Sequence, residues 1–579
     1  ALQVFLHFYI SFTDILRHHR PPPPPPPPLG AATLICSHKS NHITGEFQAG
    51  FKKGYSTTDH LFTLMACVQK QFCLNRKLYV AFIDFEKCFD TINRNLLWPV
   101  LLKNGIRGKL FCCIRSMYVT VKARIRCGAR LTDYVNCSLG VKQGDTCSPV
   151  LFSIFINELA IEVINNGRHG VTLSLDAFEL FILLLADDVV LLSETVVGLQ
   201  TQLNSLQRAA SRLCLKVNVD KSDIVVFRKG GYLAARERWF FDGNVMLVVN
   251  AYKYLGIYFS TRLSFVAACR DIASKAKKAL LCIMQRLRVY NNQSLDVFLR
   301  LFDAQVQPIM QYGSEVWGLD KAAQHCEKVH LFALKKFLSV NMRTPNDFVY
   351  NELNRYPITI NSIVSCIRYW LKIVQMDDHR LPKKAYLMLY NLDAKGKTTW
   401  VSNVRLCLFQ YGFGFVWMNQ SVGGVNEFLR VFKERLVDCR WQTWHDHVCN
   451  SDRFGVYKSF CGTSHLVPRY LQMNIDRHMK FIMTKFRFGV SDLAVHFYRY
   501  RNPTQANLKC LLCNEAEENE IHFVLCCPFF DSMRKQFIAP KYYRNPSAFC
   551  LSLLLASNNE DTVRKLCVFL YKAFKAREI

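Results

Sequence analysis

Short apolar runs separated by polar breaks predict an α+β protein with a buried hairpin near its centre. Residues 181–192, FILLLADDVVLL, contain two apolar runs on either side of Asp187 and Asp188, and each run is short enough for a buried strand. The aspartates fall where a turn between the strands is expected, so both carboxylates are predicted at the hairpin tip. Another apolar run, residues 78–83, predicts a strand that ends at Asp84.

The remaining periodicity predicts helices around these strands and a mainly helical second half. Residues 117–137 and 252–260 are expected to form further strand pairs, and Gly128 lies near the turn of the first pair. Helices are predicted from Ser56 to about Phe72, from about Arg94, up to about Ile164, from about Val197 to Leu213, and from Ser264 to Tyr290. In the last of these, one face is apolar, and Lys275, Lys278 and Arg286 lie off that face.

Charge and composition narrow the class of partner. The chain has 579 residues, half of them hydrophobic, which excludes disorder throughout. Its 74 Lys and Arg against 45 Asp and Glu give a net charge of +29, which favours a polyanion, and nucleic acid over a membrane. No apolar run is long enough for a membrane span. The 24 cysteines are scattered through apolar segments, which is typical of a reduced, intracellular protein.

The aspartates are the first candidates for chemistry. Ionised carboxylates beside so much apolar surface need positive partners, yet no lysine or arginine lies between Gly170 and Gln207. The partner therefore comes from elsewhere in the fold or is a bound cation, and Mg²⁺ is the leading candidate, because hard cations prefer carboxylate oxygen. With Asp84, three aspartates from two strands can hold the two ions used in phosphoryl transfer. The alternative is an Asp-Asp turn between core strands. Glu86 and Asp90 are assigned to the surface or to a helix cap.

Several residues are candidates for contact with a nucleotide, and each has an ordinary structural alternative. Lys52 and Lys53 occupy a glycine-bounded loop before a helix, which suits phosphate contact or is simply solvated. Gly144 allows close backbone approach to a ligand, and Gln143 can reach a base or sugar edge. Lys221, expected on a strand, can protonate a departing pyrophosphate or is an exposed turn residue.

A cysteine and histidine cluster near the C-terminus predicts a zinc site. Cys510, Cys513 and His522 are followed by adjacent Cys526 and Cys527, either of which can complete the tetrahedral set. The alternative is a group of reduced core cysteines. Upstream, basic residues interleave with aromatics and suggest either a nucleic-acid face or an ordinary solvated face: Arg487, Arg499 and Arg501. The group from His445 to Cys449 is interpreted as a surface loop rather than a metal site.

Six motifs in order resemble the reverse transcriptase domain of non-LTR (LINE-type) retrotransposons. They are QAGFKKGYST, AFIDFEKCFD, GVKQGDTCSP, LADD, NVDKS and YLGI. Later segments resemble the same elements, so the resemblance covers roughly residues 43–540. Leu185 and Cys88 depart mildly from the family pattern, and the finger motif expected before residue 43 is missing.

The resemblance implies roles for individual residues. Asp84, Asp187 and Asp188 would be the catalytic Mg²⁺ ligands of a palm, and Lys221 the candidate general acid. Phe89 matches the steric gate that favours dNTPs, and Phe85 is assigned to the same substrate side. Gln143 and Gly144 match the loop that contacts nucleotide and template. Because Pro528 after Cys527 matches the CCHC segment of these elements, Cys527 is preferred as the fourth zinc ligand.

The predicted architecture is a right-hand polymerase with partial fingers, a helical thumb and connector, and a small zinc knuckle. The expected divisions are an unrelated or artefactual Pro-rich segment (1–42), residual fingers (43–77), palm (78–262), thumb (263–320), helical connector (321–500), CCHC knuckle with basic flank (501–545) and helical tail (546–579). In the thumb, Lys275, Lys278 and Arg286 would follow the primer–template backbone.

The expected activity is RNA-directed DNA synthesis by two-metal nucleotidyl transfer. The expected partners are an RNA template, a DNA primer, dNTPs, two Mg²⁺ and one Zn²⁺, in an intracellular ribonucleoprotein of the nucleus or cytoplasm, with no membrane. The chain starts at alanine and is expected to be a fragment. The alternative is a truncated, inactive relic that still binds nucleic acid.

Overall fold

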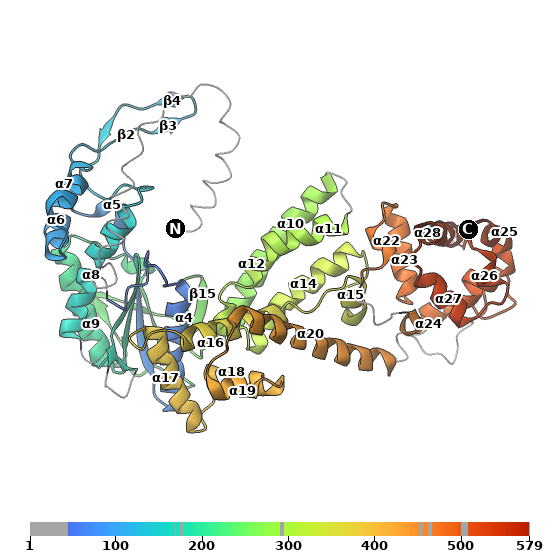
Figure 1. Ribbon diagram of the computed structural model, residues 1–579. Coiled ribbons are helices and arrows are strands. Elements are labelled where there is room, and N and C mark those ends of the chain that lie inside the picture. Colours follow the sequence, from blue (N-terminus) through green and yellow to red (C-terminus); the bar gives the residue numbers. More distant parts are fainter. Residues whose placement is uncertain are drawn as a thin grey trace.

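The computed structural model describes residues 45–167, 169–173, 178–289, 294–450, 455–460, 466–498 and 508–577. Figure 1 shows an elongated arrangement, with a β-sheet domain at one end and a helical unit at the other. Long helices of residues 266–449 lie between them. The predicted mixed α+β class is confirmed.

A five-stranded sheet organises the first domain, and its central strand is β1 (Leu78–Ile83), as predicted. β1 pairs antiparallel with β9 on one side and with β10 on the other. The full order is β13-β10-β1-β9-β8. β9 (Asp188–Ser193) and β10 (Asp223–Phe227) flank β1, and β8 (Ile182–Leu185) and β13 (Leu247–Val248) are the edge strands. The pairing of β13 with β10 is parallel.

Both faces of this sheet are buried, and alternate residues of each central strand enter different cores. Leu78, Val80 and Phe82 of β1 join a core on one face. Tyr79 and Ala81, between them, join a core on the other face. Since a strand directs successive side chains to opposite faces, a strand covered on both sides reads as a continuous apolar run.

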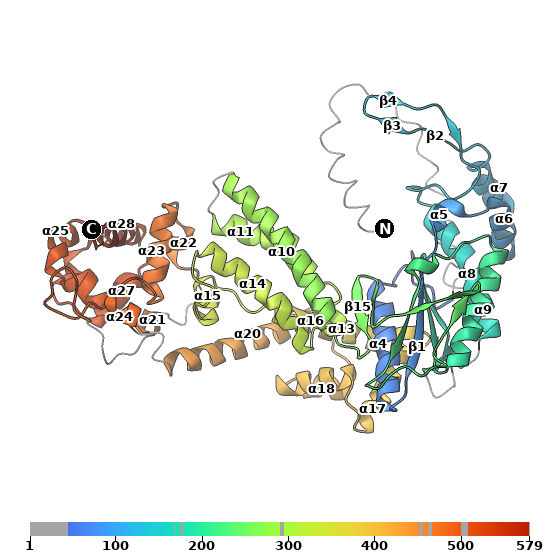
Figure 2. The ribbon, with the colours of Figure 1, turned by 180° about the vertical axis from the view of Figure 1, so that it is seen from behind.

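Helices cover each face of the sheet (Figure 2). On one side lies α4 (Thr57–Cys73), which begins at a capping box formed by Ser56 and Asp59. On the other side lie α6 (Arg94–Lys103), α8 (Ser148–Asn166) and α9 (Val196–Arg212). By length and composition α8 could cross a membrane, but 67% of its apolar window is buried inside the protein, as in a core helix.

Short elements complete this end of the molecule. The predicted strand pair at 117–137 is confirmed as two small antiparallel ladders, with Gly128 between the inner strands at a φ of 62°. Residues 251–260 form the second predicted hairpin. The remaining elements are α5 (Cys88–Thr91), α7 (Gly108–Ser116), β2 (Lys122–Ala123), β3 (Arg126–Cys127), β4 (Arg130–Leu131), β5 (Val135–Asn136), β6 (Val171–Thr172), β7 (Glu179–Leu180), β11 (Phe240–Phe241), β12 (Asn244–Val245), β14 (Ala251–Tyr254) and β15 (Ile257–Ser260).

The middle of the chain is helical and shares the core that contains α4. Its first long helix is α10 (Val266–Val289), close to the predicted bounds. The others are α11 (Leu295–Leu301), α12 (Gln307–Met310), α13 (Ser314–Trp317), α14 (Gln324–Phe337), α15 (Asn346–Glu352), α16 (Thr359–Val374), α17 (Leu381–Ala394), α18 (Trp400–Gln410), α19 (Gly414–Asn419) and α20 (Val425–Cys449). The loop interpretation of residues 445–449 is wrong, because they form the last turn of α20.

The C-terminal unit has a third core, which includes the predicted zinc ligands Cys510 and Cys527 together with residues of the last helices. The zinc cluster therefore packs with the helical tail in one unit. Its described elements are α21 (Tyr457–Phe460), α22 (Arg469–Gln472), α23 (Arg477–Arg487), α24 (Ala494–Tyr498), a turn of π-helix (His522–Cys526), α25 (Asp531–Phe537), α26 (Pro540–Tyr543), α27 (Ala548–Leu555) and α28 (Glu560–Arg577).

A buried ionic network ties the start of α4 to the loop between α16 and α17. The Asp59 carboxylate accepts hydrogen bonds from the Tyr369 hydroxyl at 3.0 Å and from Arg380 Nη2 at 3.0 Å. Arg380 also pairs with Glu46 at 3.4 Å and covers the Tyr55 ring at 3.6 Å. Because Asp59 is almost fully buried, these contacts supply the charge that its carboxylate requires.

Candidate active site

The sheet brings Asp84 next to the aspartate hairpin. In the predicted hairpin, Leu185 pairs with Asp188, so Ala186 and Asp187 form the turn. β1 pairs with β9 so that Ile83 lies opposite Val189, which places the next residue, Asp84, beside Asp188. Three carboxylates from two neighbouring strands therefore gather at one end of the sheet.

The electrostatics of this group show that its negative charge is poorly compensated. Burial, together with the charges of Asp187 and Asp84, raises the pKa of Asp188 to about 6. Burial also raises the pKa of Asp84, although the nearby Lys221 ammonium opposes the shift. The site thus suits divalent cations, which would neutralise the carboxylates and hold them ionised.

A short turn places Lys221 at this site. The backbone N–H of Asp84 donates to Ser222 Oγ at 3.1 Å, and the Asn218 N–H donates to the Asp84 carbonyl at 2.8 Å. Lys221 lies between these two anchors, in a 3-10 turn (Val219–Lys221) rather than on the predicted strand, which begins at Asp223. The turn leaves Lys221 exposed beside Asp84.

The QAG stretch supports the tip of the aspartate hairpin, a packing role that the sequence analysis did not identify. Ala49 N–H donates to the Leu184 carbonyl at 2.9 Å, and Leu184 N–H donates to the Phe47 carbonyl at 2.8 Å. A Cβ on Gly50 would lie 2.5 Å from the Ala186 backbone nitrogen. Ala186 has a positive φ of 56°, which is rare for a non-glycine residue. Gly50 is thus required by the shape of the turn.

Tyr252 is a further neighbour of the aspartates that the sequence analysis missed. Its ring stacks on Phe82 with centroids 4.3 Å apart. Burial raises the pKa of Tyr252 to about 12, with contributions from Asp188 and Asp84. The aromatic alternation of 252–260 was the only signal in the sequence, and it did not indicate which strand the hairpin would face.

The two phenylalanines predicted on the substrate side differ. Phe89 is half-buried and stacks on Phe152 with centroids 4.0 Å apart, so a rigid neighbour supports its ring. Phe85 is only 4% exposed, inside the core beneath the sheet. The prediction that Phe85 contacts substrate is wrong, because its ring completes that core.

Gln143 and Gly144 lie on an exposed turn. Gln143 Nε2 donates to Asp90 Oδ1 at 2.8 Å, which connects this turn to the short helix that carries Phe89. Gly144 has a φ of 85°, and no atom lies within 4 Å of the place a Cβ would occupy. The surface assignment of Asp90 agrees with its exposure, while Glu86 pairs with Lys216 at 3.0 Å.

Only part of the basic loop before α4 is exposed for contact with a ligand. The Lys52 side chain is 4% exposed, 3.7 Å from Glu46 and 4.2 Å from the centre of the Tyr55 ring. Burial lowers the pKa of Lys52. The prediction that Lys52 contacts phosphate is therefore wrong, because the side chain turns inward to a carboxylate. Lys53 is exposed.

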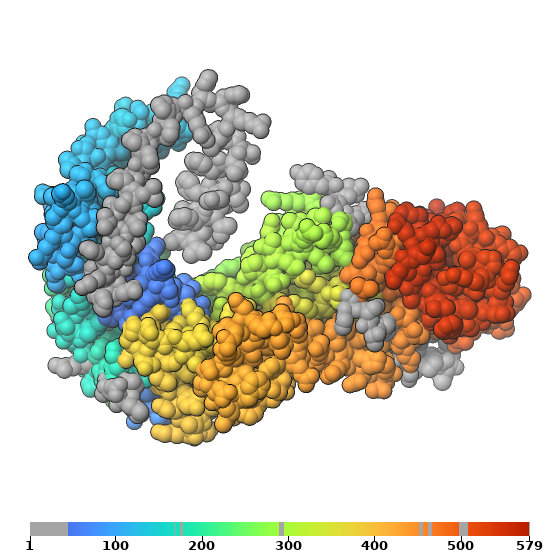
Figure 3. All heavy atoms as spheres, in the orientation of Figure 1, coloured from blue at the N-terminus to red at the C-terminus, as the bar shows by residue number. Residues whose placement is uncertain are grey.

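The basic residues predicted to bind nucleic acid also separate into different groups. Lys275, Lys278 and Arg286 are exposed on α10, although Lys275 pairs with Asp271 at 2.9 Å. In the space-filling view, α10 and the strands β2–β5 stand on opposite sides of a concave face (Figure 3).

Arg487 does not belong to an exposed basic face. Its Nε donates to Glu352 Oε1 at 2.6 Å, and its Nη1 donates to the Leu555 carbonyl at 2.6 Å. Only 7% of Arg487 is exposed, so this prediction is wrong, and the guanidinium instead joins α15 to the C-terminal helices. Arg499 and Arg501 lie outside the described residues.

The predicted cysteine and histidine ligands form a compact group. The ligand atoms of Cys510, Cys513, His522 and Cys527 all lie within 4.8 Å of one another, the single such group in the described part of the chain. The Sγ atoms of Cys510 and Cys527 are 3.9 Å apart, and Cys513 Sγ is 3.3 Å from His522 Nε2. Tetrahedral zinc with bonds of about 2.3 Å to sulfur needs sulfur separations of about 3.8 Å. The donor set and its spacing fit zinc.

The surrounding structure selects Cys527 over its neighbour. Cys526 is exposed, whereas Cys527 is fully buried. Arg534 Nη2 donates to the Cys527 carbonyl at 2.6 Å, and its Nε donates to the Val524 carbonyl at 2.9 Å. The guanidinium therefore fixes the backbone of the π-helical turn that presents the ligands.

Comparison with known proteins is consistent with this geometry. A family model described as reverse transcriptase (RNA-dependent DNA polymerase) matches residues 33–259. The match starts ten residues before the expected boundary at 43, so part of the segment that was interpreted as unrelated belongs to it. It ends in β15, and the helical second half lies beyond it.

Several relatives are RNA-directed DNA polymerases of mobile elements. The chain is 23% identical over 319 residues to the RNA-directed DNA polymerase from mobile element jockey of Drosophila funebris, covering 53% of this chain and 33% of the relative. It is 25% identical over 290 residues to the Pol polyprotein from type-1 retrotransposable element R2 of Popillia japonica, covering 48% and 46%. It is also 25% identical over 287 residues to the probable RNA-directed DNA polymerase from transposon BS of Drosophila melanogaster, covering 48% and 30%.

The aligned regions span about a third to a half of these relatives. Among solved structures, a telomerase from Candida albicans covers 62% of this chain and is covered over 57% of its own, at 12% identity and a TM-score of 0.28, which is too low to carry an argument. The family match spans the strands that place Asp84, Asp187 and Asp188. Residues 33–259 therefore match the reverse transcriptase family model, and about half of the chain is similar to proteins of mobile elements that include RNA-directed DNA polymerases.

Proposed function

We propose that this chain copies RNA into DNA by extending a primer 3′-hydroxyl with dNTPs. The observation that carries the proposal is the gathering of Asp84, Asp187 and Asp188 at one end of the sheet, within the matched domain. Their burial leaves negative charge that divalent cations would neutralise. When bound, two Mg²⁺ ions supply charge stabilisation for the attacking oxygen and for the leaving pyrophosphate.

The chain's own residues have distinct roles in this reaction. The three aspartates hold the cations in place. As the primer 3′-hydroxyl loses its proton to solvent and its oxygen bonds to the α-phosphorus, the bond to pyrophosphate breaks, and the Lys221 ammonium donates a proton to the leaving group. Phe89, supported by Phe152, excludes a ribose 2′-hydroxyl. Gln143 and Gly144 form an open turn on which the nucleotide and template rest.

Nucleic acid follows the concave face between β2–β5 and α10. Lys278 and Arg286 are exposed on α10 toward solvent, and phosphate contacts of this kind supply affinity without sequence preference. Cys510, Cys513, His522 and Cys527 would hold a zinc ion in a structural role, because four protein ligands are typical of structural rather than catalytic zinc. The complete assembly would be an intracellular ribonucleoprotein of the nucleus or cytoplasm.

Primer extension on an RNA template with the full chain tests this function. Asp187→Asn is expected to lower the rate of incorporation by about 10²-fold or more, because removal of one charge-stabilising group commonly lowers a rate constant by about that factor. Asp438→Asn, an exposed residue of α20, removes the same charge and should leave extension unchanged. Salt-dependent RNA binding without any incorporation in Mg²⁺ or Mn²⁺ would instead identify the chain as an inactive, nucleic-acid-binding relic.

A further inference from the structure

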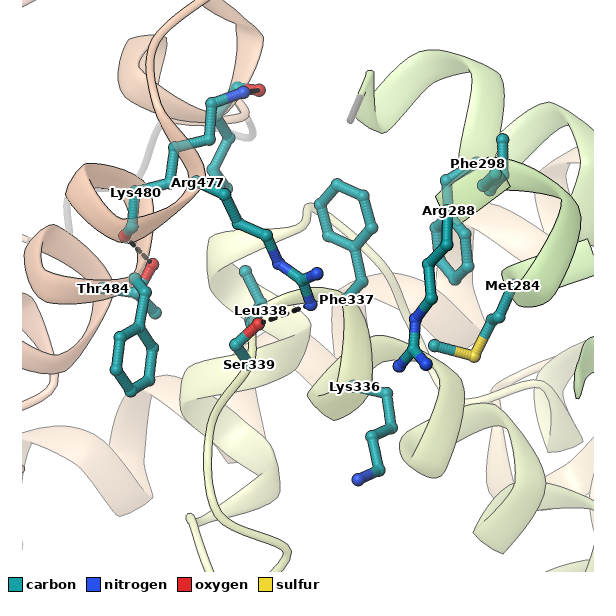
Figure 4. Close-up of a pocket in the computed structure, with 13 residues that line it drawn as sticks. Met284, Arg288, Phe298, Lys336, Phe337, Leu338, Ser339, Arg477, Lys480 and Thr484 are labelled. Carbon is teal, nitrogen blue, oxygen red and sulfur yellow. Dashed lines mark hydrogen bonds between the residues drawn. The ribbon is translucent and has the colours of Figure 1, made fainter. Parts of the chain in front are cut away.

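A basic pocket lies between the long helix α10 and the C-terminal unit. Its walls come from α10, α14 and α23, and it encloses about 340 Å³, a volume within the usual range for ligand sites. Figure 4 shows the guanidinium groups of Arg477 and Arg288 entering from opposite walls, with Phe337 between them. The pocket belongs to neither the aspartate site nor the zinc cluster.

The charge of this pocket has a single sign. Arg288, Lys336, Arg477 and Lys480 line it, and no carboxylate does. Arg477 Nη2 donates to Ser339 Oγ at 3.2 Å, and Lys480 Nζ donates to the Leu471 carbonyl at 3.3 Å. None of the four forms an ion pair with a carboxylate among the residues that the structure describes. Four cations that converge without a counter-charge favour an anionic ligand.

Partial burial of these cationic side chains also favours an anionic ligand. Lys480 is half-buried, and its desolvation lowers the pKa of its ammonium group. An anion in the pocket would reverse this shift, because an opposite charge stabilises the protonated form. Phosphate groups are suitable partners, since they accept hydrogen bonds from guanidinium and ammonium groups together.

The same pocket has aromatic walls. Phe298, Phe337 and Phe481 line it, and the rings of Phe298 and Phe337 stack with centroids 4.8 Å apart. Phe481 is half-buried, and Lys485 Nζ lies 4.6 Å from the centre of its ring. Cationic groups interleaved with aromatic rings are typical of sites that hold an unpaired nucleotide by its phosphate and its base.

We propose that this pocket is a second nucleic-acid site, which binds the backbone phosphate and an unstacked base of a single strand. It depends on the proposed function only in taking nucleic acid as its ligand. The site would extend the nucleic-acid path from α10 onto α23, so the C-terminal unit would hold a strand outside the polymerase domain. An acidic peptide would satisfy the charges but has no use for the aromatic walls.

The test measures binding of the full chain to a fluorescent 20-nucleotide single strand over a salt series. Arg477→Gln with Lys480→Gln is expected to weaken binding about 10-fold and to reduce the salt slope by about 0.7, the value for one lost phosphate contact on a single strand. Lys395→Gln with Lys397→Gln removes the same charge from an exposed loop and should change neither quantity. RNA and DNA strands of one sequence show which strand the pocket holds.

The opposite wall provides an independent check. Arg288→Gln with Lys336→Gln should reproduce the loss, which excludes a folding defect of α23 as the cause. Equal affinity and equal slope in both double variants and the control would overturn the proposal, as would competition by an acidic peptide at the affinity of the oligonucleotide. Extension of a short hairpin primer–template should persist in both variants. Its absence in the wild type would reject the proposed function and leave this binding result standing.

Discussion

The aspartate group and the cysteine–histidine group both bring together side chains that can bind metal ions, but the fold assembles them in opposite ways. The aspartates come from strands about a hundred residues apart, joined by β-sheet register. The zinc ligands fall within 18 residues and have their ligand atoms within 4.8 Å of one another. A closed local cage suits an ion that stays, whereas carboxylates at a sheet end with uncompensated charge suit ions that arrive with substrate. The difference is the one expected between a structural metal site and a catalytic metal site.

The largest expected effect comes from removing one ligand of the cysteine–histidine group. Cys527→Ser should abolish stoichiometric zinc binding and unfold the C-terminal unit, because binding energies of structural zinc reach about 10 kcal/mol. Metal content and thermal unfolding measure this. Cys526→Ser is the matched control and should retain zinc, since Cys526 is exposed outside the group. Equal zinc loss in the two variants would show that the ligand set is misassigned.

The second effect tests whether Arg487 stabilises the C-terminal unit or binds nucleic acid. Arg487→Gln should lower the free energy of unfolding by about 3 kcal/mol, because it leaves the buried Glu352 carboxylate without its ionic partner. Denaturant unfolding provides the measurement. Arg435→Gln, exposed on α20, should cost almost nothing. If Arg487→Gln instead weakened RNA binding at unchanged stability, the buried ion pair would be the wrong description of this residue.

The third effect tests whether the backbone at Gly50 holds the tip of the aspartate hairpin in place. Gly50→Ala should slow primer extension about 100-fold, because its Cβ would collide with the Ala186 backbone and shift the hairpin tip. Single-turnover extension rates measure the change. Gly230→Ala has open space around its Cβ and no positive φ, so it should extend normally. An unimpaired Gly50→Ala variant would mean that the tip tolerates displacement.

The smallest effect is a gain in stability. In the folded protein the pKa of Asp188 is about 6, above an unfolded value of about 3.9. Its ionisation therefore destabilises the fold as pH rises between these values, and above pH 6 the cost is about 2–3 kcal/mol. Asp188→Asn should recover that amount at pH 7 and nothing below about pH 4.

The measurement for this variant is denaturant unfolding across the pH range, with and without Mg²⁺. Added Mg²⁺ should stabilise the wild type more than Asp188→Asn, because the cation binds the ionised carboxylate. A pH-independent difference between the two proteins would contradict the assigned shift. The zinc group should show no corresponding response to Mg²⁺.

Sequence reasoning succeeded where a signal was local. The apolar runs around Asp187 and Asp188 located the hairpin, and the run before Asp84 located β1 within its observed bounds. The ligand spacing at the C-terminus indicated Cys510, Cys513 and His522, and the family resemblance favoured Cys527 over Cys526 as the fourth member of the group that the structure brings together. In each case neighbouring residues determine both the element and its burial.

The errors arose where a distant partner decides burial. Lys52 turns inward to Glu46 in a loop that Arg380, far along the chain, contacts through Glu46 and Tyr55, and Arg487 is buried because it pairs with Glu352, 135 residues away. Phe85 fills a core whose other members come from helices far along the chain. A charge or an aromatic ring in a sequence does not reveal whether a partner will cover it, so exposure was assumed where the fold provides burial.

The network at Asp59 sets a limit on how far this chain can be shortened without loss of its fold. The family signature ends at residue 259, yet Tyr369, Lys372 and Arg380 neutralise a carboxylate at the start of α4, next to the segment that supports the hairpin tip. A chain that ended at residue 259 would leave the buried Asp59 carboxylate without its positively charged partners. The folded unit that contains the aspartates therefore includes the charges that pair with Asp59, and it extends at least to Arg380, more than a hundred residues beyond the end of the family match.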